Sequence, residues 1–330
     1  MQHNAERAWR LFTVNWIGVG LMAVALALGL ALSGLSLKPQ SVALPVVSAA
    51  LFTGIAYVIV ALARRRDCAT AFALGSAAQL VLITALMTPL TYIAATADLP
   101  LQDANLAALD RMLGLDWRGY LSFLNDWPGL SRFFGLGYAM IGWPLFAVPV
   151  LLAMQRHYGR LQQFTLAFAL ALIATTIVST LVPALGAYQQ LGLTPADSAY
   201  LAPLGYVDQL RDFPLVRDGS LRELDLMQLV GIITFPSFHA AAAVLYVWVF
   251  WSIWWMRPAA IIVDGAMLLA TPAGGGHYFV DVFVGMGVAV LAIAAACWIG
   301  ERAMRPAMPP AESVEAGPQP LPEPAARSFA

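Results

Sequence analysis

Long runs of apolar residues, separated by shorter polar segments, dominate this chain. Eight runs are long enough, or nearly so, for a helix to cross a hydrocarbon layer about 30 Å thick at a rise of about 1.5 Å per residue. The pattern therefore predicts an all-α fold, a polytopic membrane helical bundle of about eight spans. The expected spans are residues 11–35, 43–63, 70–96, 132–154, 163–184, 232–255, 259–273 and 277–300.

The composition supports this interpretation and narrows the possible partners. Hydrophobic residues make up 60% of the chain, charged residues make up 11%, and the mean hydropathy is +0.72. These values are typical of a membrane protein. The net charge of −1 argues against a nucleic-acid partner. Cys68 and Cys297 fall in or beside apolar runs, so they predict neither a disulfide framework nor a metal site. The first run is longer than the apolar part of a signal peptide and is expected to remain as a spanning anchor.

The distribution of basic residues predicts the orientation. With the N-terminus in the cytoplasm, the cytoplasmic segments hold 11 of the 18 lysines and arginines, although the outer segments are longer. Because basic residues favour the cytoplasmic side of short loops, this is the expected orientation. It places His239, His277 and Asp281 at the outer face, in an integral membrane protein of the cell or inner membrane.

Two polar motifs stand at the mouths of apolar runs and contain two of the four histidines. Residues 235–239 read Phe-Pro-Ser-Phe-His, and residues 274–281 read Gly-Gly-Gly-His-Tyr-Phe-Val-Asp. The chain between them forms two apolar legs joined by a turn at Arg257–Pro258. A chain that leaves one membrane face at the first motif therefore returns to the same face at the second, and the two imidazoles can meet there.

The second motif has the spacing of an oriented histidine. His277 and Asp281 are four residues apart and share one face of a helix that begins near the glycines. The carboxylate can accept the Nδ1–H of the imidazole, which leaves Nε2 free as a base or nucleophile. Gly285, four residues further on, keeps this face narrow and permits close helix packing. The alternative is that His277 and Asp281 form only a satisfied polar pair inside the membrane.

Both motifs also contain signals for anion binding. The glycines at 274–276 can point backbone N–H groups at an anion just before a helix, and Gly275 and Gly276 are candidate substrate ligands. Pro236 and Ser237 indicate a helix start, with Ser237 as cap or phosphate donor and His239 in the first turn. Together the motifs predict a phosphate site in which one histidine attacks phosphorus and the other transfers protons.

The long segment before the fourth span predicts a helix of its own. Residues 106–114 look like a short amphipathic helix that ends at Gly114. This helix is expected to lie on the membrane or to cap the bundle. Trp117, Tyr120 and Trp127 follow and suit the headgroup level of a bilayer. Asp264, inside the seventh span, is interpreted as a packing partner or, alternatively, a proton relay.

The two motifs resemble the second and third signature motifs of the type 2 phosphatidic acid phosphatase superfamily. The sequences of the two motifs are most similar to those of its inositol phosphorylceramide synthase branch, in which the third motif typically has the form His-Tyr-x-x-Asp. Leu-Asp at 109–110 and Gly-Leu-Asp-Trp at 114–117 also resemble that branch. The resemblance implies that His277 is the nucleophile, Asp281 its orienting carboxylate and His239 the general acid. It implies no metal and no organic cofactor.

The resemblance also suggests how the chain is divided. It implies a six-span catalytic core over 70–302, with outer loops at 97–131 and 185–230. Residues 1–69 would then add two N-terminal spans and a cytoplasmic loop. Residues 303–330, rich in Pro, Ala and Glu, are expected to form a disordered cytoplasmic tail.

The basic residues that the superfamily uses around the phosphate are missing. The chain lacks the first motif, a Lys followed by Arg-Pro, and Lys38 is its single lysine. Ala270 and Thr271 stand where a Ser-Arg pair usually precedes the nucleophile. Because a phosphoryl group needs stabilisation of its charge, another arginine is expected to supply it. Arg217, in a Leu-Val-Arg-Asp-Gly turn that resembles one of the synthase branch, is the first candidate, and the alternatives are Arg211, Arg222 and Arg118.

These observations lead to one principal hypothesis and two alternatives. The principal one is a lipid phosphatase or phosphotransferase that cleaves a phospholipid or sphingolipid phosphate ester at the outer leaflet. A phosphohistidine is its intermediate, and water or a lipid alcohol is the acceptor. The first alternative is a transporter or flippase with a His/Asp proton relay, which predicts broken helices in paired repeats. The second is a pseudoenzyme that binds lipid phosphate without turnover.

Overall fold

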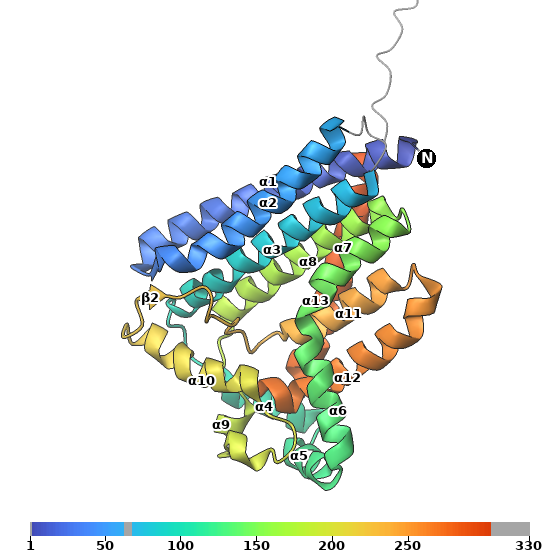
Figure 1. Cartoon of the computed structure of the whole chain (residues 1–330). Helices are drawn as coiled ribbons and strands as arrows, with labels where there is room; N and C mark the ends of the chain where they lie inside the picture. Colours follow the sequence, from blue (N-terminus) through green and yellow to red (C-terminus); the bar gives the residue numbers. More distant parts are fainter. Residues whose placement is uncertain (1, 63–67, 305–330) are drawn as a thin grey trace, which may run out of the picture.

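The protein, described by a computed structural model over residues 2–62 and 68–304, is almost entirely helical (Figure 1). Apolar runs with few internal breaks form the long helices, and the polar segments between them form short helices. The helices are α1 (Gln2–Ser33), α2 (Pro39–Leu62), α3 (Cys68–Ala95), α4 (Asp103–Met112), α5 (Trp117–Asp126), α6 (Pro128–Ala139), α7 (Pro144–Met154), α8 (Tyr158–Leu181), α9 (Ala187–Gln190), α10 (Leu204–Arg217), α11 (Phe238–Phe250), α12 (Arg257–Gly275) and α13 (Phe279–Met304). Short 3₁₀ turns lie at Met140–Gly142, Pro195–Asp197 and Trp254–Met256.

The predicted all-α membrane bundle is confirmed, but two of the eight expected spans are irregular. Six of the described helices are long and apolar enough to cross a membrane: α1, α2, α3, α8, α12 with the turn before it, and α13. The expected span at 132–154 is a pair of helices, α6 and α7, bent by 66°. Pro144, at the first position of α7, has no N–H with which to continue α6, and this accounts for the break.

The expected span at 232–255 has to be corrected, because its α-helix is only Phe238–Phe250, followed by the 3₁₀ turn that starts at Trp254. Residues 232–237 are not helical and are held by partners outside their own segment. Ile232 N–H donates to the Thr91 hydroxyl, and the Thr234 hydroxyl donates to the carbonyl of Ala184. Pro236 has no N–H for a helical hydrogen bond and Ser237 is the N-cap, so α11 begins at Phe238.

The N-terminal helices pack directly on the rest of the bundle. α1 packs against α3, α8 and α13, and α2 packs against α3. Inside the bundle, Asn15 Nδ2 of α1 donates to Gln162 Oε1 of α8 at 3.0 Å, and Gln162 Nε2 donates to the Ser76 hydroxyl of α3 at 2.8 Å. Buried hydrogen bonds of this kind hold helices together where lipid offers no polar partner.

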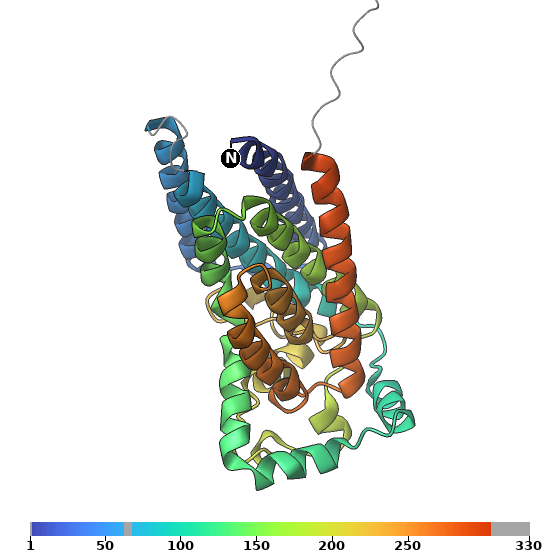
Figure 2. The same cartoon turned by 90° about the vertical axis from the view of Figure 1, so that its right-hand side faces the viewer.

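The two ends of the bundle are different. The N-terminus and the end of α13 lie together at one end, whereas α4, α5, α9 and α10 gather at the other (Figures 1 and 2). The expected tail lies almost entirely outside the described residues, as do the arginines at 64–66. The predicted amphipathic helix is confirmed as α4, which begins three residues earlier, at Asp103, and is followed by Gly114 with a φ of +73°.

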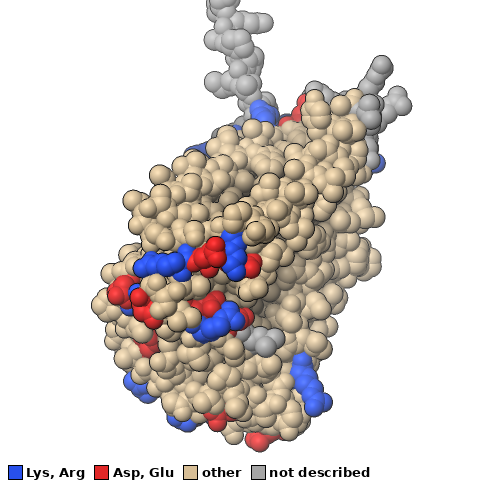
Figure 3. Space-filling model, turned by 60° about the vertical axis from the view of Figure 1, so that its left-hand side comes forward, with Lys and Arg blue, Asp and Glu red and all other residues tan. Residues whose placement is uncertain are grey.

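A short parallel sheet and several ion pairs surround α10. Strands β1 (Ser36–Leu37) and β2 (Glu223–Leu224) tie the α1–α2 connection to the segment after α10. Lys38 pairs with Asp225 at 3.6 Å beside this sheet. One face of the molecule is largely uncharged, and basic and acidic residues gather together on its lower part (Figure 3). Further charged residues are visible at the upper end, and an uncharged belt between two charged ends suits a protein that spans a bilayer.

Candidate active site

The two motifs meet where α11 and α13 begin. Ser237 is the N-cap of α11, as the sequence predicts, and its hydroxyl accepts the N–H of Ala240 at 3.4 Å. Its own N–H donates to the carbonyl of Asp281 at 3.1 Å. Gly285 makes this approach possible, because a Cβ there would stand 2.2 Å from the carbonyl oxygen of Ser237. The structure thereby joins the two halves of the site through backbone atoms.

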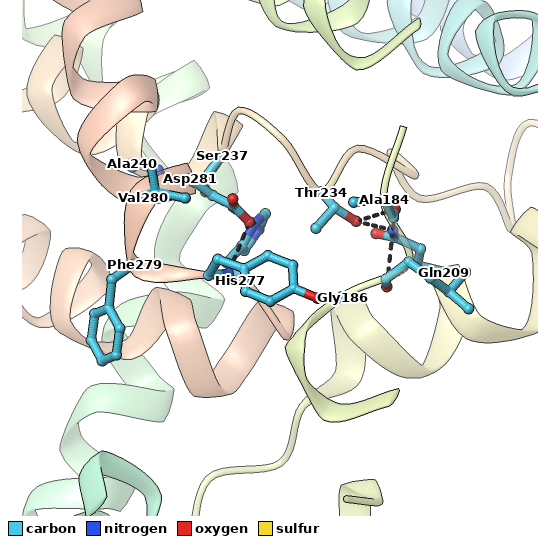
Figure 4. Close-up of polar contacts among 12 residues, drawn as sticks. Ala184, Gly186, Gln209, Thr234, Ser237, Ala240, His277, Phe279, Val280 and Asp281 are labelled. Atoms are coloured by element: carbon cyan, nitrogen blue, oxygen red, sulfur yellow. Dashed lines mark hydrogen bonds and ion pairs between the residues drawn. The ribbon is translucent and has the colours of Figure 1, made fainter. Parts of the chain in front are cut away.

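His277 lies between a carboxylate and a hydroxyl (Figure 4). Its Nδ1 is 3.3 Å from Asp281 Oδ2, and its Nε2 is 3.3 Å from Ser237 Oγ. The side chain is only 4% exposed and that of Asp281 is fully buried. With the proton on Nδ1 donated to Asp281, Nε2 carries a lone pair that accepts the Ser237 O–H. Any electrophile that replaces this hydroxyl would meet a nucleophilic nitrogen.

The glycine run occupies a different place from the one expected. Gly274 and Gly275 form the end of α12, Gly276 has a φ of +66°, and α13 begins only at Phe279. The glycines therefore end one helix instead of opening the next, and His277 lies in the connection between the two. A Cβ on Gly275 would stand 2.4 Å from His277 Cδ2, so the imidazole needs glycine at this position.

His239 approaches the same site from α11 without bonding to His277. Its ring stacks on Tyr138 of α6, with centroids 4.0 Å apart and planes 6° apart. Tyr138 in turn lies near His277, because its hydroxyl oxygen and His277 Nε2 are 2.6 and 2.8 Å from the position that a Cβ of Gly275 would occupy. The structure therefore brings together His277, Asp281, His239, Ser237, Gly275 and Gly276.

Two aspartates of α4 hold the start of α13 in place, and sequence reasoning did not identify them as part of the site. Asp110 accepts the N–H groups of Phe279 and Val280, both at 2.9 Å. Burial raises the pKa of Asp110, and these two N–H groups partly offset that rise. Asp103 accepts the Tyr278 hydroxyl at 2.9 Å. Their spacing of seven residues on an amphipathic helix, which places both on one face, is the signal that could have identified them.

Asp103 also fixes the chain opposite Tyr278. Its carboxylate accepts the N–H groups of Leu185 and Gly186, at 3.0 and 2.8 Å for the shorter contact of each. Next to this segment, Gln209 of α10 and Thr234 bond to each other and to the carbonyl of Ala184 (Figure 4). Three connections of the chain are thereby tied together beside His277.

Trp117 has a different role from the one expected at the headgroup level. It is 5% exposed, and its Nε1–H donates to the carbonyl oxygen of His277 at 3.0 Å. Tyr120 is directed inward too, because its hydroxyl bonds the carbonyl of Leu269. Of the three aromatic residues, Trp127 is the most exposed, at 59%. The bonds of Trp117 and Tyr120 tie this segment to His277 and to α12.

Within the described residues, the hydrogen bonds and ion pairs of His277 and Ser237 involve no lysine or arginine. Arg217 pairs with Asp98 at 2.5 Å and with the carbonyl of Leu99 at 2.9 Å. The other candidates also bond elsewhere: Arg211 to Asp208 and Asp212, Arg222 to the carbonyl of Ser33, and Arg118 to the carbonyl of Leu191. Thr271, in place of the usual arginine, bonds back to Met267 of its own helix.

Comparison with known proteins identifies the family. The model of the PAP2 superfamily, the type 2 phosphatidic acid phosphatases, matches residues 104–295, more than half of the chain. The chain belongs to this superfamily, whose members are typically phosphatases and phosphotransferases, and this indicates an enzyme with phosphatase-type activity on lipid phosphate. Searches among characterised proteins and among solved structures found no match.

Proposed function

We propose that this protein cleaves the phosphate ester of a membrane lipid through a phosphohistidine on His277. The observation that carries the proposal is the arrangement of Asp281, His277 and Ser237, in which one imidazole nitrogen is held by a carboxylate and the other faces a replaceable hydroxyl. A histidine oriented in this way is an activated nucleophile. These residues also lie at the N-terminal ends of two helices, α11 and α13, and the positive dipole ends of the helices favour an anion.

In the first half-reaction, His277 Nε2 attacks phosphorus. An N–P bond forms, the bond from phosphorus to the leaving oxygen breaks, and His239 gives its proton to that oxygen. Asp281 stabilises the positive charge that develops on the imidazole. The stacking of His239 on Tyr138 supports this assignment, because it holds the second imidazole beside the site without consuming it in a bond to Asp281.

In the second half-reaction, His239 accepts a proton from the acceptor hydroxyl, a new P–O bond forms and the N–P bond breaks. The acceptor is water in a phosphatase and the alcohol of a second lipid in a phosphotransferase. The His-Tyr-x-x-Asp motif at 277–281 favours a reaction like that of the inositol phosphorylceramide synthases. The resemblance of residues 109–117 to that branch favours the same reaction. The distribution of basic residues further supports an active site at the exoplasmic face.

Two alternatives lead to different expectations. A transporter of the broken-helix type is expected to have two matched interruptions in related repeats. Among the described helices, one bent pair is found, α6 with α7. The second alternative, a pseudoenzyme, is favoured by the missing basic residues of the family pattern. It predicts that the protein binds lipid phosphate and forms no product.

Product analysis by mass spectrometry tests the proposal. Purified protein in liposomes would receive phosphatidic acid and glycerophospholipids, with and without ceramide or diacylglycerol as acceptor. His277→Ala is the test variant, and His157→Ala, which changes an exposed histidine in the connection before α8, is the matched control. Free phosphate or a new head-grouped lipid should disappear with His277→Ala alone. Equal product from wild type and His277→Ala would exclude His277 as nucleophile.

A further inference from the structure

In the part of the chain that the structure describes, no lysine or arginine bonds to His277, so the charge of a phosphoryl group needs another partner. Three first-turn N–H groups of α10, at residues 204–206, have no acceptor within their own helix. This N-terminal end of α10 faces α12 and the site, whereas the other end lies by β2 (Figure 1). Tyr206, in this turn, places its ring against Gly276 and Gly186, next to His277.

Tyr138 of α6 points its hydroxyl between this turn and the catalytic histidine. The hydroxyl oxygen is 3.0 Å from the position that a Cβ of Gly205 would occupy and 2.6 Å from that of Gly275. His277 Nε2 lies 2.8 Å from the same Gly275 position. The phenol and the nucleophilic nitrogen are therefore close neighbours across a glycine that leaves the space between them open.

The Tyr138 side chain is 9% exposed, and within residues 2–62 and 68–304 its hydroxyl donates to no protein acceptor. The hydroxyl is not one of the fully buried polar atoms without a partner, so it reaches open space, where an anion could accept its O–H. Tyr278, another tyrosine of the site, differs from Tyr138 because its hydroxyl donates to Asp103. Of these two tyrosines, Tyr138 is the one whose hydroxyl donates to no described residue.

We infer that the Tyr138 hydroxyl and the first-turn N–H groups of α10 at Gly205 and Tyr206 form the oxyanion site that holds a phosphoryl oxygen of the substrate beside His277. This inference rests on the proposed function and names the groups that replace the missing basic residues. Uncharged donors aimed at an anion in a water-poor site can supply the stabilisation that cations supply elsewhere. Arg217 is too distant to do so: it lies twelve residues beyond Gly205, about 18 Å at 1.5 Å per residue.

The test measures phosphate binding and catalysis separately. Binding of inorganic phosphate to the purified full-length protein in detergent would be followed by titration calorimetry, and kcat and KM would be measured on the lipid that gives product. Tyr138→Phe keeps the ring on His239 and removes only the hydroxyl. Tyr246→Phe is the matched control, because its buried hydroxyl bonds the carbonyl of Ile141 outside the site.

Tyr138→Phe is expected to weaken phosphate binding and to lower kcat/KM by about 10- to 100-fold, the usual cost of a lost hydrogen bond to a charged group. Gly205→Ala, which places a methyl group 3.0 Å from the hydroxyl, should weaken both as well. Tyr246→Phe should bind and react as wild type does. Unchanged thermal unfolding of Tyr138→Phe would show that the effect is not one of folding.

Failure of this inference differs from failure of the proposed function. Phosphate binding that is equal in wild type and Tyr138→Phe, or absent from wild type at millimolar phosphate, would overturn the inference. Lipid product that depends on His277 but not on Tyr138 would also overturn it and would leave the function standing. Phosphate binding that depends on Tyr138, without lipid product from wild type, would support the anion site and reject the function.

Discussion

Gly285 of α13 lies against the carbonyl oxygen of Ser237, so close that a Cβ would stand 2.2 Å from it. Because Ser237 caps α11 and faces His277 Nε2, the separation of the two helices sets the geometry of the site. Every side chain larger than hydrogen at position 285 has to push the helices apart. Several measurable consequences arise from this and from the other contacts around the site.

Gly285→Ala should lower activity by about 10- to 100-fold, since a displacement of about 1 Å at a reacting group can have this effect. It should also destabilise the fold by about 1–3 kcal/mol through overpacking. The control is Gly287→Ala, two residues further along α13, where a Cβ would meet no atom within 4 Å. Activity assays and thermal unfolding in detergent measure both effects. Equal behaviour of the two variants would refute the packing argument.

Asp281→Asn should leave the fold intact and reduce kcat by about 10²- to 10⁴-fold, because an amide cannot stabilise the imidazolium as a carboxylate does. The Tyr278 N–H can still bond to the amide oxygen, which preserves the turn. Single-turnover kinetics would place the loss in the formation of the phosphoenzyme. A variant with wild-type kcat would show that Asp281 is only a structural partner of His277.

Asp110→Asn tests the positioning of α13 by α4. The carboxylate bonds two N–H groups at the start of α13, at Phe279 and Val280, and interacts with the positive end of that helix. The free energy of unfolding of the variant should be about 1–2 kcal/mol lower than that of wild type, and the variant should lose activity. Asp126→Asn, at an exposed position of α5, is the control. If both variants keep full stability, Asp110 has no capping role.

Trp117→Phe removes the indole N–H that bonds the carbonyl of His277 and keeps an aromatic ring beside Tyr188. We expect a stability loss of about 0.5–1.5 kcal/mol and a measurable fall in kcat, because the backbone of the nucleophile loses one support. Trp127→Phe, at an exposed position, should change neither. A kcat unchanged by Trp117→Phe would show that the other contacts of His277 are sufficient to hold it in place.

The acid stability of the bundle should depend on Asp212 of α10. Burial raises the pKa of Asp212, but hydrogen bonds from Arg211 and the Tyr92 hydroxyl outweigh that effect, so its pKa falls below the ordinary value of 3.8. Its contribution to stability is therefore complete above pH 3.8 and disappears as the pH falls through the lowered folded-state pKa.

Asp212→Asn should reduce the unfolding free energy by about 1–3 kcal/mol at neutral pH, since it removes charged hydrogen bonds. The difference in Tm from wild type should shrink as the pH falls below 3.8. Thermal unfolding of both proteins between neutral and strongly acidic pH measures this. A difference that stays constant over the whole range would contradict the assignment to Asp212.

Much of the site could be predicted because its signals are local. The Ser237 cap, the i, i+4 pair of His277 and Asp281, and the narrow face at Gly285 depend on residues within one helical turn or one helix end. The length of apolar runs similarly predicted the membrane helices. The exceptions are the expected span at 132–154, which is the bent pair α6 and α7, and α11, which is shorter than its apolar run. Ile232 and Thr234, before α11, bond to residues far away in the chain, and no local pattern reports such bonds.

The supporting residues could not be predicted for the same reason. Asp103, Asp110 and Trp117 bond to partners about 80 to 175 residues away in the chain, and the stacking of Tyr138 on His239 joins α6 to α11. Arg217 looked suitable because it precedes the first motif, yet the length of α10 carries it away from His277 and towards Asp98.

By itself, the sequence determined the groups that make up the candidate site: the two histidines, the carboxylate one turn away and the helical membrane setting around them. Those properties depend on residue type and short spacing, which folding does not alter. Only the tertiary structure decided which groups surround His277. It turned charged candidates towards carboxylates and carbonyls of their own, and it brought a tyrosine and a helix end to His277 through the packing of α6, α10 and α12.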